Sequence, residues 1–187
     1  MGTMAADVDI PVAPRRKNGL ASWTPVGLAV VGLLIIAYFI FRPTSTPSLV
    51  GQVAPGFTVQ DINGHPLRLA DLRGRPVVLN FWGVNCIYCR KEMPLLQQAY
   101  QQHQGARLAI VGIDVQDNDP TIVRTYVQQR GTTYPATLPG SVDWGGLYKV
   151  NDLPQSVFID RQGMIRESDA KPFLDAGSLE QSLATIL

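Results

Sequence analysis

Two cysteines, Cys86 and Cys89, are the residues of this chain whose type and spacing most directly suggest chemistry. They enclose Ile87 and Tyr88, follow the apolar run PVVLNFW (76–82), and stand where a helical pattern begins. A thiol at the start of a helix faces unpaired backbone N–H groups and the positive end of the helix dipole, and both favour the thiolate. The thiolate is the form that attacks disulfides, and the second sulfur is close enough to close a ring, so the spacing predicts disulfide exchange.

Two other uses of the cysteine pair are open. A purely structural disulfide across four residues would stabilise the fold by only about 2 kcal/mol on the chain-entropy relation. A zinc site needs about four ligands, and only His65 and His103 could join the cysteines, without the paired spacing of zinc motifs. We therefore expect no metal and no cofactor, and we assign the histidines no role.

The elements that must position the pair alternate between strands and helices. A capping box from Ser178 to Gln181 favours a closing helix, and Asn63-Gly64 favours the turn of a small N-terminal hairpin. The pattern predicts an α/β fold with a mixed central sheet covered on both faces. The predicted strands are 57–60, 67–69, 76–82, 107–114, 156–160 and 164–167, and the predicted helices are 86–104, 120–130 and 178–187.

An apolar run near the N-terminus predicts a membrane anchor. No charged residue lies between Gly19 and Phe41, and a helix over 25–41 approaches the roughly 30 Å hydrocarbon core. The run is longer than the usual core of a signal peptide and ends without small residues, which favours an uncleaved anchor over a cleaved signal.

Basic residues set the expected orientation of this anchor. Arg15, Arg16 and Lys17 precede the run, and only Arg42 follows closely, so the N-terminus should be cytoplasmic. The pair Arg15-Arg16 is also compatible with a twin-arginine export signal. Ordinary topogenic charge is the simpler explanation.

Four segments follow from this reading: a cytoplasmic N-terminus (1–22), a transmembrane anchor (23–41), a linker rich in Pro, Ser and Thr (42–50) and a folded domain (51–187). Four of the 16 Lys and Arg residues and two of the 15 Asp and Glu residues precede residue 51, which leaves the domain nearly neutral. That balance argues against nucleic acid or acidic lipid as a partner.

Several separate motifs together resemble a known family. They are GQVAPGF (51–57), LADLRGRPVVLNFW (69–82), the cysteine pair with RKEMP (90–94), and Tyr148, Val150, Pro154 and FID (158–160). On these residues the domain resembles the membrane-anchored thioredoxin-like proteins of the TlpA/ResA/CcmG type, which are related to the AhpC/TSA redoxins. The resemblance implies a thioredoxin fold with an added N-terminal β-hairpin and a central insert. It also implies reduction of disulfides outside the cytoplasm, often those of the haem-attachment cysteines of apocytochrome c.

Carried over by position, the resemblance implies that Cys86 is the nucleophile and Cys89 the resolving cysteine of a redox-active disulfide. Glu92, three residues after Cys89, matches an acidic residue that could accept or return a proton there. The alternative for Glu92 is an exposed glutamate stabilised by the first helical turns.

Pro154 falls where thioredoxin-like proteins place a cis-proline beside the cysteines. A cis bond turns the preceding backbone toward the site, where it can pair with an extended substrate chain. The alternative is an ordinary loop proline. We assign substrate binding to Pro154 together with Leu153, Trp82 and Asn85.

Three departures from the family pattern leave the substrate open. Asn85 stands where an aromatic residue is usual, and Ile87-Tyr88 replaces a pair that commonly ends in proline. Both change the surroundings of Cys86, and with them its pKa and reduction potential. Gln155 stands where threonine is common and alters the docking edge.

The expected function is an extracytoplasmic thiol–disulfide oxidoreductase in the inner membrane, reducing exported proteins. Its partners would be exported protein thiols and disulfides and, from the resemblance, a transmembrane electron donor of the CcdA or DsbD type. A disulfide oxidant or isomerase of the DsbA type and a redox-passive binding module remain alternatives. Peroxidase chemistry is disfavoured, because the chain has no Pro-x-x-x-Thr-x-x-Cys arrangement.

Overall fold

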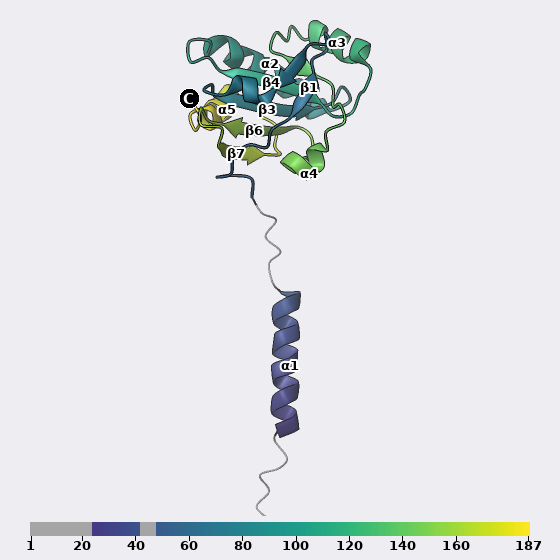
Figure 1. The fold of residues 1–187 in the computed structure, drawn as a ribbon, viewed down its shortest axis with the longest axis vertical. Coiled ribbons are helices and arrows are strands. Elements are labelled where there is room, and N and C mark those ends of the chain that lie inside the picture. Colours follow the sequence, from purple (N-terminus) through teal and green to yellow (C-terminus); the bar gives the residue numbers. More distant parts are fainter. Residues whose placement is uncertain (1–23, 42–47) are drawn as a thin grey trace, which may run out of the picture. The chain divides into compact units, whose positions relative to one another are not determined.

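The computed structural model describes residues 24–41 and 48–187 (Figure 1). The chain divides into two compact units, residues 1–46 and residues 47–187. The predicted cytoplasmic segment and most of the predicted linker lie outside the described residues.

The described part of the first unit is a single apolar helix, α1 (Thr24–Ile40). No helix within residues 24–41 and 48–187 is both long enough and apolar enough to cross a membrane. The anchor predicted over 23–41 stays a prediction, and its first residue lies outside the described residues.

A five-stranded mixed sheet forms the centre of the second unit (Figure 1), in the order β5-β4-β3-β6-β7. The central strand β3 pairs in parallel with β4 and antiparallel with β6, and all six of its residues are buried. The strand that leads to the cysteines is thus held on both sides. The strands are β3 (Val77–Trp82), β4 (Ala109–Asp114), β5 (Ala136–Thr137), β6 (Gln155–Ile159) and β7 (Ile165–Asp169).

Alternate residues of β3 point to opposite faces of this sheet, and helices cover the apolar side chains on both faces. On one face Val78 packs in a cluster with residues of α2 and α5, and Trp82 packs in a second cluster with residues of α2 and α3. On the other face Leu79 and Phe81 pack against α4 and the segment around Phe57. The helices are α2 (Ile87–Gln102), α3 (Pro120–Gln129), α4 (Trp144–Tyr148) and α5 (Ala176–Leu183).

A two-stranded antiparallel sheet, β1 (Thr58–Gln60) with β2 (Pro66–Arg68), precedes a short 3₁₀ helix, η1 (Leu69–Leu72). This hairpin turns through Asn63 and Gly64, as predicted, and Gly64 has a positive φ of 86°. An antiparallel β-bridge between Asp61 and Thr137 of β5 joins the hairpin to the large sheet.

The predicted mixed sheet, both hairpins and the helices after β3 and β4 are confirmed, whereas the predicted cap of the last helix is wrong. The side chain of Asp175 accepts a hydrogen bond from the backbone N–H of Ser178, so α5 begins at Ala176 and Ser178 lies in its first turn. An aspartate three residues earlier competes successfully with the serine for the cap position. β5 and α4 were not predicted, because two and five residues are too few to show a period.

Candidate functional site

Cys86 and Cys89 form a disulfide at the start of α2. Their sulfur atoms are 2.02 Å apart and their Cα atoms 5.3 Å apart. Cys86 is the N-cap residue with extended backbone, and its Sγ accepts a hydrogen bond from the backbone N–H of Cys89 at 3.1 Å. When the disulfide opens, this N–H and the helix dipole stabilise a thiolate on Cys86.

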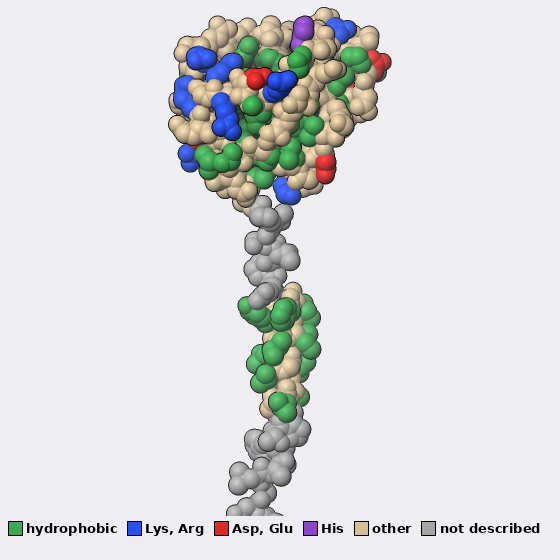
Figure 2. Space-filling model, in the orientation of Figure 1, with side chains coloured by type: hydrophobic (Ala, Val, Ile, Leu, Met, Phe, Trp, Pro, Cys, Tyr) green, Lys and Arg blue, Asp and Glu red, His purple; other side chains and the backbone are tan. Residues whose placement is uncertain are grey.

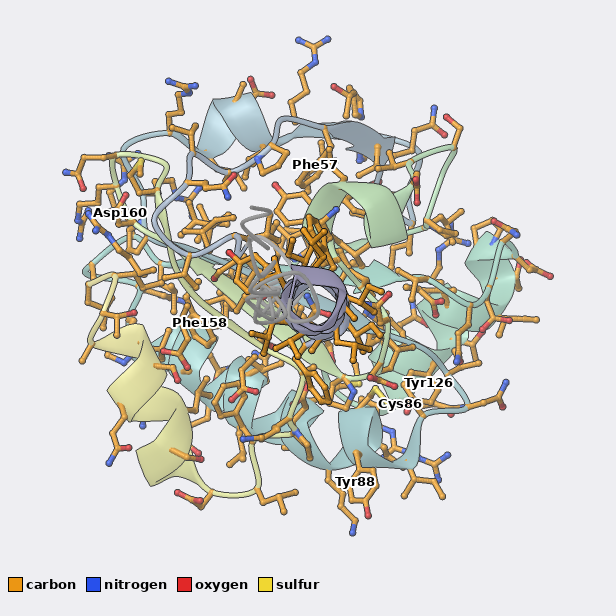
Figure 3. The ribbon with its side chains drawn as sticks, turned by 90° about the horizontal axis from the view of Figure 1, so that it is seen from below. Phe57, Cys86, Tyr88, Tyr126, Phe158 and Asp160 are labelled. Atoms are coloured by element: carbon orange, nitrogen blue, oxygen red, sulfur yellow. A yellow bond between two sulfur atoms is a disulfide. The ribbon has the colours of Figure 1, made fainter. Side chains whose placement is uncertain are left out.

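The two sulfur atoms differ in accessibility. Cys86 is partly exposed, whereas Cys89 is 0% exposed. Between them, Ile87 and Tyr88 are 64% and 53% exposed, and Figure 3 shows Tyr88 pointing outward. An incoming sulfur atom can therefore reach Cys86 first.

Glu92 lies on the buried side of α2 and is 0% exposed. One carboxylate oxygen accepts a hydrogen bond from Nδ2 of Asn80 at 2.7 Å, and the other accepts one from the backbone N–H of Phe173 at 3.1 Å. Burial raises the pKa of Glu92 from 4.5 to about 7, and the two hydrogen bonds offset part of that rise. The alternative of an exposed glutamate is wrong. A carboxyl group with this pKa can exchange a proton near neutral pH.

Leu153 and Pro154 lie immediately before β6, the antiparallel neighbour of β3. The peptide bond between them is cis, as predicted, and Pro154 is buried. The Leu153 side chain packs against the apolar cluster that contains Cys89 and Trp82. The predicted substrate-binding role of these residues stays a prediction.

Trp82, also predicted to bind substrate, is only 1% exposed. Its ring stacks against that of Tyr126 from α3, with ring centroids 5.3 Å apart and planes inclined by 23°. Gly112 on β4 leaves room for this arrangement, since a Cβ atom there would lie 3.0 Å from Nε1 of Trp82. In this structure Tyr126 covers Trp82, and Asn85 is exposed.

Tyr126 and the N-terminal hairpin complete the apolar surroundings of the disulfide. Tyr126, Ile62 and Cys86 pack against the same cluster. The hairpin is held there because the N–H of Ile62 donates to the carbonyl oxygen of Ala136 at 3.0 Å, and the Arg124 guanidinium donates to the carbonyl oxygen of Ile62.

A second buried carboxyl group, Asp114, lies at the end of β4, opposite Trp82 in the sheet register. Its Oδ1 accepts hydrogen bonds from the N–H groups of Gln116 and Asp117 at 2.7 and 2.9 Å. Burial raises the pKa of Asp114 to about 6, the two hydrogen bonds lower it in part, and the Asp117 charge raises it further. Asp114 therefore fixes the turn after β4, beside the strand that leads to Cys86.

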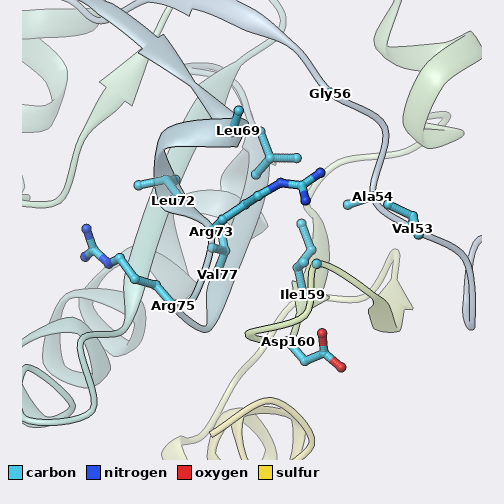
Figure 4. A pocket seen from close by; sticks show the side chains of 12 residues that line it. Val53, Ala54, Gly56, Leu69, Leu72, Arg73, Arg75, Val77, Ile159 and Asp160 are labelled. Atoms are coloured by element: carbon cyan, nitrogen blue, oxygen red, sulfur yellow. The ribbon is translucent and has the colours of Figure 1, made fainter.

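A cavity of about 90 Å³ lies elsewhere, between the segment 53–56, η1 and the end of β6. Figure 4 shows the Arg73 side chain extended along it, and none of the predicted site residues lines it. In the described residues, no group of three or more His, Cys, Asp or Glu side chains is arranged to hold a metal ion.

Lys and Arg side chains gather at one side of the domain in the view of Figure 2. Two arginines near the cavity have a structural explanation. Arg75 donates to the carbonyl oxygen of Arg107 at 2.9 Å, and Arg161 donates to that of Ala106 at 3.1 Å. These bonds hold neighbouring loops together.

Comparison with known proteins agrees with this arrangement. The model of the AhpC/TSA family matches residues 50–168, more than half of the chain. The chain belongs to the AhpC/TSA family.

Two curated members of this kind are thiol-disulfide oxidoreductases named ResA. The protein from Bacillus thuringiensis (strain Al Hakam) is 36% identical over 118 residues, which cover 63% of this chain and 68% of the relative. The protein from Geobacillus kaustophilus is 32% identical over 141 residues, which cover 75% of this chain and 79% of the relative. The predicted resemblance to the ResA type and the predicted enzyme class, a thiol–disulfide oxidoreductase, are confirmed.

Solved structures show the same fold. A thiol:disulfide interchange protein DsbE from Chlorobium tepidum superposes with a TM-score of 0.66 at 26% identity, covering 73% of this chain and 96% of that one. A protein disulfide isomerase from Bacteroides thetaiotaomicron gives a TM-score of 0.62 at 29% identity, covering 72% and 86%. The predicted thioredoxin fold is confirmed.

Sequence reasoning missed three residues at the site of this AhpC/TSA-family protein. Asn80 carried a signal, since it is the one polar residue in the apolar run 76–82. Ile62 and Tyr126 carried none, because each reaches the site only through contacts between segments distant in the sequence.

Proposed function

We propose that this AhpC/TSA-family protein reduces disulfides of exported proteins through Cys86 and Cys89. One observation carries the proposal: an accessible cysteine at a helix start is joined to a fully buried one, on a helix that also carries a buried carboxyl group. This arrangement separates the attacking sulfur from the resolving sulfur. The ResA-type relatives support the reaction class.

The reaction has two exchange steps. In the reduced enzyme the Cys86 thiolate attacks one substrate sulfur, a bond forms between them, and the other substrate sulfur leaves as a thiolate that takes a proton from water. Cys89 then loses its thiol proton and attacks the sulfur of Cys86, which releases the second substrate sulfur. Two electrons pass to the substrate, and the enzyme ends with the Cys86–Cys89 disulfide.

In this proposal Glu92 accepts the thiol proton that Cys89 loses in the second step. It lies three residues after Cys89 on α2, and its pKa of about 7 lets it accept a proton near neutral pH and release it afterwards. The Cys89 thiol is buried away from water, so a nearby buried base is needed to remove its proton.

The proposal extends to partners by resemblance. The substrates are disulfides of exported proteins, including the haem-attachment cysteines of apocytochrome c. Electrons come from a transmembrane donor of the CcdA or DsbD type, which re-reduces the Cys86–Cys89 disulfide. Equilibration with thiol buffers of known potential tests the direction of this electron flow.

We further propose that the folded domain works on the outer side of the inner membrane, with the N-terminus inside. The support is the charge pattern, three basic residues before the apolar run and one directly after it. A reporter enzyme that works only outside the cytoplasm, fused after Leu187, should be active. Activity from a reporter that works only inside the cytoplasm would reverse the orientation and remove the exported substrates from the proposal.

A further inference from the structure

Asn80 is a polar residue in the middle of a strand where an apolar one would be expected. It lies on β3 between Leu79 and Phe81, and all three side chains are 0% exposed. Burying an amide costs free energy unless its polar atoms are hydrogen-bonded. The proposed mechanism gives Asn80 no role, so the burial of its amide needs another explanation.

The Asn80 amide lies at the centre of a buried polar cluster made of Asn80, Glu92, Ser156 and the backbone N–H of Phe173. Its Nδ2 donates to Oε1 of Glu92 at 2.7 Å and to Oγ of Ser156 at 3.1 Å. The cluster joins β3 to α2, to β6 and to the segment before α5. Asn80 is therefore a direct partner of the carboxyl group that the proposed function uses.

The hydrogen bonds that Glu92 accepts are those of an ionised carboxylate. Each carboxylate oxygen accepts from an N–H group, which an ionised carboxylate requires because it has no proton to donate. In this arrangement Oδ1 of Asn80 is buried and, among the described residues, receives no hydrogen bond.

A protonated Glu92 fits this cluster less well. Its proton needs an acceptor, which Oδ1 of Asn80 can offer if the amide turns by half a turn. That turn takes both Nδ2 hydrogens away from Oε1 of Glu92 and Oγ of Ser156 and moves them to the position where Oδ1 has no partner among the described residues. The cluster therefore favours the ionised carboxylate.

We propose that Asn80 is a positioning residue that holds the Glu92 carboxyl group in place and favours its ionised form by donating a hydrogen bond to Oε1. The inference rests on the proposed function, in which Glu92 takes the proton of Cys89. It goes beyond that function by naming the side chain that offsets part of the effect of burial on the Glu92 pKa.

The surroundings of Glu92 leave this task to a neutral partner. Asn80 from β3 and Ser156 from β6 form the cluster with it, the backbone of Phe173 faces it before α5, and Cys89 precedes it on α2. Tyr134, before β5, is buried, and both its burial and the Glu92 charge raise its pKa, so it stays neutral. None of these described partners carries a positive charge that would fix Glu92 in its ionised form.

The test is a carboxyl titration by carbon-13 NMR on the full chain. The chain has three glutamates, Glu92, Glu167 and Glu180, so label in the glutamate carboxyl carbons gives three signals that single Glu→Gln variants assign. In Asn80→Leu the ionised carboxylate loses a donor, and the Glu92 midpoint should rise by at least about one pH unit. Ser156→Ala keeps the Asn80–Glu92 bond and should shift the midpoint less. In the unmodified chain the side-chain amide signal of Asn80 should change with the midpoint of Glu92.

An unchanged Glu92 midpoint in Asn80→Leu, or an Asn80 amide signal that does not respond to pH, would overturn the inference. Asn80→Asp serves if the leucine variant does not fold, because two adjoining carboxyl groups should share a proton and give two separated titration steps. A single unshifted step would also overturn it. Disulfide exchange by the unmodified protein is measured separately. Its absence at every pH would sink the proposed function and leave the NMR result to decide the role of Asn80.

Discussion

Cys86→Ser should lower the rate of disulfide exchange by at least about 1000-fold, because a serine hydroxyl is not ionised near neutral pH and cannot attack a sulfur atom. The loss should be this large because Cys89, at 0% exposure, cannot take over the attack. The measurement is the rate at which reduced protein opens the disulfide of a peptide substrate.

Cys89→Ser is the matched control for this experiment. It keeps the accessible thiol of Cys86 but lacks the resolving sulfur, so it should attack once and accumulate a mixed disulfide, visible as an increase in mass. Retention of the cellular function by Cys86→Ser would instead favour a redox-passive binding module. Strong exchange activity in that variant would contradict the assigned order of the cysteines.

Glu92→Gln should change both the pH dependence of catalysis and that of stability. The folded-state pKa of about 7 lies above the ordinary 4.5, so between these values the folded state holds a proton that the unfolded state has released. The wild-type protein should therefore lose stability as pH rises through this window, by on the order of 3 kcal/mol at most. Glutamine has no such proton, so the variant should lack this part of the pH dependence.

Urea unfolding at pH 5 and pH 8 measures the effect. The difference between wild type and variant isolates Glu92, because Asp114, whose pKa is also raised, is present in both. Asp152→Asn removes an exposed carboxylate before β6 and should behave like the wild type. Equal pH dependence in wild type and Glu92→Gln would mean that Glu92 is ionised throughout. An unchanged rate of the second exchange step would remove it from the mechanism.

The local part of the site could be predicted from the sequence. The run 76–82 and the helical pattern after it place Cys86 at a helix start, which fixes the order of the two sulfurs, and the structure agrees. The resemblance to thioredoxin-like proteins at Pro154 likewise implied the cis bond. In each case the signal and the feature lie within a few residues of each other.

The remainder depends on contacts between distant segments. Glu92 meets Asn80 twelve positions earlier and Phe173 eighty-one positions later, and only the folded sheet brings them together. Periodicity alone therefore left the burial of Glu92 undecided. The start of α5 was misplaced for a local reason, because Ser178 and Asp175 both have side chains suited to cap a helix.

The reduction potential of the Cys86–Cys89 pair tests the central claim, reduction of exported disulfides, most directly. The protein is equilibrated with glutathione or dithiothreitol buffers and the oxidised fraction is measured. A reductase should have a potential nearer to the roughly −270 mV of thioredoxin than to the roughly −120 mV of DsbA. The gap of about 150 mV corresponds to about 7 kcal/mol for a two-electron couple, which makes the outcomes easy to separate. A value close to that of DsbA would contradict the reductase claim and make the protein an oxidant that uses the same cysteines.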